Sequence, residues 1–119
     1  MVCECPSQCI CNKRAYIDCK NGNLTVFPRG IPSNAKSLSL VNNKIPSLNR
    51  KDFTGLTSLR YLYLNNGILT NIDEDTFTAL RNLSYLGLSD NKLKQICIRV
   101  VAYVKVLGLV RKSVDGDRI

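Results

Sequence analysis

Cysteine is the residue type whose number and spacing point most directly to chemistry in this chain. Six cysteines are present, and five of them are crowded near the N-terminus, at Cys3, Cys5, Cys9, Cys11 and Cys19. Such a cluster is typical of a disulfide framework or of a metal site. Zinc sites favour cysteine pairs two to four residues apart, often with histidine, whereas here the close pairs enclose a single residue and the chain has no histidine. The spacing favours disulfides over a metal site, and we predict that the protein has no metal or other cofactor. Disulfides in turn predict an oxidising, extracellular compartment.

Other chemistry-bearing residues indicate modification rather than catalysis. The sequons Asn23-Leu24-Thr25 and Asn82-Leu83-Ser84 are candidates for N-glycosylation in a secreted protein. No nucleophile paired with a base and no phosphate-binding loop is recognisable, so we predict that the chain is not an enzyme. The acidic run at 73–75 lacks the spacing of a calcium loop and is interpreted as a solvated turn.

The charge balance is basic, with 17 Lys and Arg against 9 Asp and Glu, for a net charge of +8. An excess of this size favours anionic partners, or it only keeps the protein in solution. No single tract is densely basic, and we expect no nucleic-acid partner. The longest apolar run, 96–110, contains Arg99 and Lys105 and is too short to span a bilayer. No signal peptide is visible, and our hypothesis is that one has been removed.

A repeat of 24 residues is the element that must position these side chains. Its copies begin at Ala35, Leu59 and Leu83 and follow the pattern L-x-x-L-x-L-x-x-N-x-L, which is that of a leucine-rich repeat. The predicted fold is an α/β leucine-rich-repeat solenoid, a short right-handed horseshoe with a parallel concave sheet. Its predicted parts are a cysteine-rich cap over 1–34, three repeats over 35–96 and an irregular C-terminal segment over 97–119.

Each repeat is expected to begin with a short strand whose leucines point into the core. Apolar residues on the convex side, Phe27, Phe53 and Phe77 among them, should return to that core. Asn43 and Asn91 stand where the strand bends, and their side chains can bond backbone groups that the bend leaves unpaired. The middle repeat has Gly67 at this position instead, and the neighbouring Asn66 is the candidate to supply the missing asparagine's hydrogen bonds.

The concave face should carry the strand side chains that point away from the core. Tyrosine is prominent among them, with serine, asparagine and glycine around it, and this composition is typical of antibody-like recognition. The alternative is that tyrosine simply suits exposed strands. The candidate ligand-binding residues are Tyr16, Lys36, Arg60, Tyr61, Tyr63, Asn65, Tyr85 and Asp90.

The N-terminal segment resembles the cap of extracellular leucine-rich-repeat proteins. The residues that show this are the run from Cys5 to Cys11, then Cys19, then 24–32. Over about residues 3–96 the chain resembles the variable lymphocyte receptors of jawless vertebrates and their relatives among the invertebrate chordates. The cap also resembles that of Slit-type guidance proteins. The resemblance implies the disulfides Cys5–Cys11 and Cys9–Cys19.

After Ile96 the pattern of the family ends, and the usual disulfide-bonded C-terminal cap is missing. The segment Val104-x-x-Leu107-x-Leu109 is predicted as a last strand, with an amphipathic helix as the alternative. An uncapped edge tends to pair with another chain. We therefore predict a possible homodimer through 97–112, to which Cys3 or Cys97 could add a disulfide between chains; alternatively, the segment folds over the last repeat.

The resemblance implies a secreted, non-catalytic recognition module of the immune-receptor type. It would bind protein or glycan ligands, including those of microbial surfaces, through its concave face. The alternative is a cell-signalling or extracellular-matrix module with one specific protein partner. The fold is shared by both kinds of module, so the sequence does not separate them.

Overall fold

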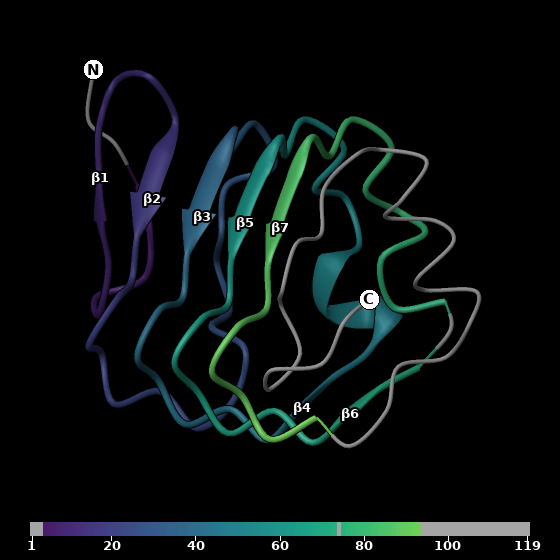
Figure 1. Cartoon of the computed structure of the whole chain (residues 1–119). Helices are drawn as coiled ribbons and strands as arrows, with labels where there is room; N and C mark the ends of the chain where they lie inside the picture. The colour runs from purple at the N-terminus through teal and green to yellow at the C-terminus, as the bar shows by residue number, and fades with distance from the viewer. Residues whose placement is uncertain (1–3, 74, 94–119) are drawn as a thin grey trace.

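The computed structural model describes residues 4–73 and 75–93, and the concave side of its solenoid is a five-stranded sheet (Figure 1). The strand order is β1-β2-β3-β5-β7. The hairpin β1 (Ile10–Cys11) and β2 (Tyr16–Asp18) opens the sheet, and only this pair is antiparallel. The strands β3 (Ser37–Ser39), β5 (Tyr61–Tyr63) and β7 (Tyr85–Gly87) follow in parallel.

The register of the parallel strands confirms the predicted repeat. Leu38 pairs with Leu62, and Leu62 pairs with Leu86, so equivalent residues 24 positions apart are neighbours. These leucines are at most 1% exposed because alternate strand residues point to opposite faces, and theirs is the core face. The fold is a leucine-rich-repeat solenoid, as predicted.

The convex side is closed by short elements and by a line of phenylalanines. The strands β4 (Ser47–Leu48) and β6 (Asn71–Ile72) pair in parallel, and the 3₁₀ helix η1 (Arg50–Phe53) follows β4. Phe27, Phe53 and Phe77 pack in sequence, with ring centroids 5.0 and 5.6 Å apart. Within the described ranges η1 is the only helix, so none there is long and apolar enough to cross a membrane.

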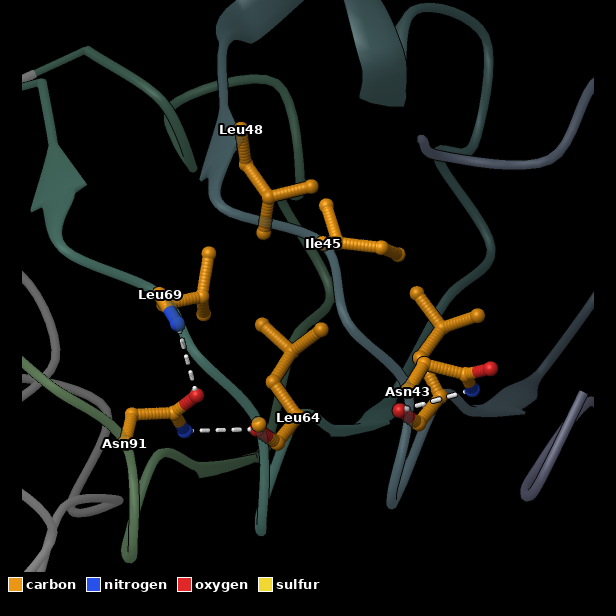
Figure 2. Close-up of a pocket in the computed structure, with 8 residues that line it drawn as sticks. Asn43, Ile45, Leu48, Leu64, Leu69 and Asn91 are labelled. Atoms are coloured by element: carbon orange, nitrogen blue, oxygen red, sulfur yellow. Dashed lines mark hydrogen bonds between the residues drawn. The ribbon is translucent and has the colours of Figure 1, made fainter. Parts of the chain in front are cut away.

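Asn43 and Asn91 are buried and bond backbone groups of two repeats, as predicted. Asn43 accepts hydrogen bonds from the amides of Gly22 and Leu24 and donates to the carbonyl of Cys19 at 2.9 Å. Asn91 accepts from Leu69 and donates to Leu64 in the same way (Figure 2). The interpretation of Asn66 was wrong. Its backbone takes the left-handed turn position, with a φ of 58°, and its side chain is exposed rather than buried beneath the strand.

The N-terminal cap contains one of the two expected disulfides. Cys9 and Cys19 are bonded, and Cys19 is fully buried. The expected Cys5–Cys11 bond is not formed. The Cys5 thiol instead donates a hydrogen bond to the carbonyl of Cys9 at 3.7 Å. The Cys9 amide donates to the carbonyl of Pro6 and so closes the turn between these two cysteines. The predictions on Cys3, Cys97 and the segment 97–112 fall outside the described residues.

Candidate protein-binding surface

The predicted tyrosines form two rows across the concave sheet. The first row consists of residues paired from strand to strand: Tyr16, Ser37, Tyr61 and Tyr85. The second row consists of Asp18, Ser39, Tyr63 and Gly87, paired in the same way. Tyr16 is 44% exposed and Tyr85 is 37% exposed, which is high for aromatic side chains in a sheet. The sheet therefore presents its aromatic groups on the face opposite the leucine core.

Tyr63 and Tyr85 are in direct contact, with ring centroids 5.1 Å apart at 41°. Tyr63 on β5 is paired with Gly87 on β7, two residues along the strand from Tyr85. Aromatic pairs in such tilted arrangements are more favourable than area burial alone predicts. The contact gives the β5–β7 end of the described sheet a preformed aromatic platform, and we call Tyr61, Tyr63 and Tyr85 the tyrosine cluster.

The ionisation of Tyr63 is set by this cluster. Burial raises the pKa of the Tyr63 phenol above its ordinary value, and the neighbouring phenols of Tyr85, Tyr61 and Tyr16 raise it further. The hydroxyl therefore keeps its proton throughout the physiological range. It can donate a hydrogen bond to a partner as well as accept one.

Asn65 continues the surface beyond the tyrosine cluster and is held in place. Its amide Nδ2 donates to the Ser89 hydroxyl at 2.6 Å, and its Oδ1 lies against Gly87. A β-carbon at Gly87 would overlap Asn65, so the glycine allows this side chain to lie flat on the sheet. The sequence indicated Asn65 as a flanking residue but gave no sign of its bond to Ser89.

Charged candidates lie at opposite ends of the strands. Lys36 and Arg60 are exposed and immediately precede β3 and β5, at the edge where the strands begin. Asp90 follows β7 at the other edge, with a φ of 61°. Asn42 and Asn66 have the same left-handed conformation in their own repeats, so Asp90 also has a structural function in the turn. The structure does not bring Asp90 together with Lys36 and Arg60.

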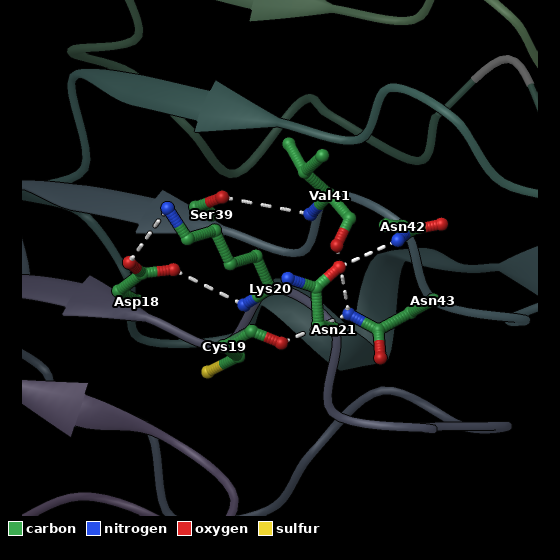
Figure 3. Close-up of polar contacts among 8 residues, drawn as sticks. All are labelled: Asp18, Cys19, Lys20, Asn21, Ser39, Val41, Asn42 and Asn43. Carbon is green, nitrogen blue, oxygen red and sulfur yellow. Dashed lines mark hydrogen bonds and ion pairs between the residues drawn. The ribbon is translucent and has the colours of Figure 1, made fainter.

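Polar contacts at the edge where β2 and β3 end were not predicted from the sequence (Figure 3). Lys20 forms an ion pair with Asp18 at 3.8 Å, and the amide of Asn42 donates to the side chain of Asn21. The offset of 21 residues between β2 and β3 was the signal that would have placed Asn21 beside Asn42. The bond between Asn42 and Asn21 ties the cap to the first regular repeat, whereas the ion pair lies within the cap.

Both sequon asparagines are exposed. Asn23 has a φ of 57° and precedes the buried Leu24. The Asn82 amide donates to the carbonyl of Thr57 at 2.7 Å. Glycosylation at either position stays a prediction.

Comparison with known proteins agrees with this geometry. Residues 17–66 match the family described as "Leucine rich repeat". The crystal structure of human 5T4, also named trophoblast glycoprotein and Wnt-activated inhibitory factor 1, superposes with a TM-score of 0.77 at 28% identity over 83% of this chain. The chain has the leucine-rich-repeat fold.

Similar sequences come from several larger leucine-rich-repeat proteins. A peroxidasin homolog of Caenorhabditis briggsae is 45% identical over 56 residues, or 46% of this chain. Mouse podocan is 35% identical over 56% of the chain, and human oligodendrocyte-myelin glycoprotein is 37% identical over 58%. The latter two are extracellular. The chain spans 4%, 11% and 16% of these three proteins, respectively, and 36% of the 5T4 chain.

Proposed function

We propose that this leucine-rich-repeat chain is a secreted, non-catalytic recognition module that binds one specific protein partner through its concave tyrosine cluster. The observation that carries the proposal is the tyrosine cluster itself. It offers large, partly exposed aromatic side chains held by the sheet and by one another. Tyrosine is enriched among the residues that dominate binding energy at protein interfaces.

The extracellular homologues support a cell-signalling or matrix setting for this module. An immune-receptor setting, with microbial protein or glycan as the ligand, is the second proposal. It is favoured by one observation, the antibody-like mixture of tyrosine with Ser37, Ser39, Asn65 and Gly87 on one face. The two settings differ in ligand class but use the same surface.

A binding screen of the whole chain separates them. The chain is tetramerised and applied to an array of extracellular protein domains and to an array of glycans and microbial surfaces. We expect one or a few protein domains to bind, and the double variant Tyr61→Ala/Tyr63→Ala to weaken that binding at least thirtyfold, since interface anchors lose roughly 2 kcal/mol or more when truncated.

The matched control is Val26→Ala, which removes an exposed apolar side chain outside the concave strands. Circular dichroism must show that each variant is folded. Undiminished binding by the tyrosine double variant would rule out the concave surface. Binding confined to microbial surfaces would favour the immune-receptor setting.

A further inference from the structure

The edge at which the concave strands begin is uniformly basic. The segments that lead into β2, β3, β5 and β7, residues 12–15, 33–36, 57–60 and 81–84, contain no Asp or Glu. Their charged residues are all cations, and all are exposed: Lys13, Arg14, Lys36, Arg60 and Arg81. This edge is the upper one in Figure 1, and we call these residues the basic edge.

Backbone hydrogen bonds place these segments side by side. The Lys36 amide donates to the carbonyl of Ala15, next to Arg14, and the Arg60 amide donates to the carbonyl of Lys36, each at 2.8 Å. The bond from Asn82 to the carbonyl of Thr57 brings the residue after Arg81 against the neighbouring segment. Because neighbouring strands are about 4.8 Å apart, the cations follow one another in a strip along the edge.

The basic edge differs from the rest of the described surface. Two cations elsewhere on that surface are paired with carboxylates, Lys20 with Asp18 and Arg50 with Asp75, both at 3.8 Å. Within residues 4–73 and 75–93 no ion pair involves a residue of the basic edge. Like charges held this close repel one another, and a bound polyanion would relieve that repulsion while releasing its own counterions.

We propose that the basic edge binds a sulfated glycosaminoglycan. The four segments carry no exposed large apolar side chain, since Leu59 and Leu83 are buried. A protein partner would need such an anchor, whereas a linear polyanion needs only cations at regular intervals. Sulfated glycosaminoglycans are linear, keep their charge at every physiological pH, and occur outside cells, which is the compartment proposed for this chain. The basic edge is thus a second binding surface that adjoins the tyrosine cluster, since Arg60 directly precedes Tyr61, but takes a different ligand.

The test is calorimetric titration of the whole chain with a heparin-derived oligosaccharide at several salt concentrations. We expect the double variant Lys36→Gln/Arg60→Gln to bind the oligosaccharide about 25-fold more weakly. Each cation next to an anionic surface contributes roughly a factor of five to the affinity, and two are removed. The affinity of this variant should also depend less steeply on salt, because fewer counterions are released. The matched control is Lys44→Gln/Lys92→Gln, which removes the same charge from exposed positions outside the basic edge.

The control should bind within about twofold of the unmodified chain. An equal loss in the two double variants would show that net charge alone attracts the oligosaccharide and would overturn the proposal. Binding of desulfated heparin or poly-glutamate as tight as that of the sulfated oligosaccharide would overturn the choice of a sulfated glycan.

Tyr63→Ala should leave heparin affinity unchanged, and a loss as large as that of Lys36→Gln/Arg60→Gln would show that the two surfaces are one. Thermal unfolding checks that every variant is folded.

Discussion

Single buried asparagines hold the turns that follow β3 and β7 toward the convex side. Asn91 is 5% exposed, yet its amide reaches the carbonyls of Leu64 and Leu88 and the backbone amide of Leu69. A buried backbone group without a partner costs roughly 1–3 kcal/mol, so one side chain that satisfies several groups stabilises two repeats together. Gly67 interrupts this arrangement between Asn43 and Asn91.

The interruption leaves a specific backbone group unpaired. Asn43 binds the amide of Leu24 and Asn91 binds that of Leu69, so an asparagine at 67 would stand opposite the amide of Ile45. Among the described residues no hydrogen bond to that amide is formed. The backbone conformation at position 67 does not require a glycine, because its φ is not in the left-handed region. The obstacle to a larger residue is Asn91, whose Oδ1 would lie 2.7 Å from the new β-carbon.

Gly67→Asn should therefore stabilise the protein. We expect the free energy of unfolding to rise by about 1 kcal/mol. This is the net stabilisation from the new hydrogen bonds, reduced by the cost of a small displacement of Asn91. Urea denaturation measures the gain. Gly67→Ala is the matched control, since it adds the β-carbon without the amide and should give no gain. Equal stability of the two variants would show that the unpaired amide is not the cause of the weakness.

Tyr63 should make stability depend on pH in the alkaline range. Its pKa is raised in the fold, mainly by burial, so the folded state favours the protonated phenol. The resulting stabilisation is complete below the unfolded pKa of about 10 and is lost as pH rises through the folded pKa. Unfolding free energy should consequently fall more steeply above pH 10 in the unmodified chain than in Tyr63→Phe.

Absorbance of the tyrosinates gives an independent measure of the same group. The chain has five tyrosines and no tryptophan, so the signal is not overlaid by indole. The difference between the titration curves of the unmodified chain and Tyr63→Phe isolates Tyr63. A midpoint at or below about 10 in that difference would contradict the raised pKa.

Among the elements, the concave strands were predictable and the convex ones were not. Leu38, Leu62 and Leu86 recur every 24 residues, and a period of two within each strand fixes which side chains face the core. The convex η1 begins with a capping box between Asn49 and Asp52, a local pattern that the 24-residue repeat does not specify. A two-residue strand such as β4 has no periodicity from which to predict it.

The candidate site was predictable to the same degree. The strand pattern placed Tyr61, Tyr63 and Tyr85 on one face, because alternation follows from the pleat. It could not give the contact between Tyr63 and Tyr85, since strand alternation fixes the face of a side chain but not the position of its ring. The cap shows a further limit. Sequence resemblance supplied the pair Cys9–Cys19 correctly but also implied Cys5–Cys11, and cysteine spacing alone cannot choose a connectivity.

Across the whole molecule, each repeat buries its apolar face only against its neighbours. Leu62 is fully buried on β5, between Leu38 of β3 and Leu86 of β7, so its side chain contributes to the packing of three repeats. In a stack of this kind stability is the sum of the repeats and of the interfaces between them. A cavity in the middle should therefore weaken the stack as a unit.

Leu62→Ala is expected to lower the free energy of unfolding by about 2–5 kcal/mol, the range for a large side chain removed from a packed core. Ile10→Ala is the matched control, since Ile10 is 77% exposed on the edge strand β1 and its truncation should cost no more than about 0.5 kcal/mol. Urea denaturation followed by far-ultraviolet circular dichroism reports the sheet, and near-ultraviolet dichroism reports the tyrosines of the concave face. The two signals should coincide in both variants, because the loss at Leu62 is transmitted through both interfaces of β5. Separate transitions, or a loss near that of Ile10→Ala, would mean that the repeats on either side of β5 are stable without it.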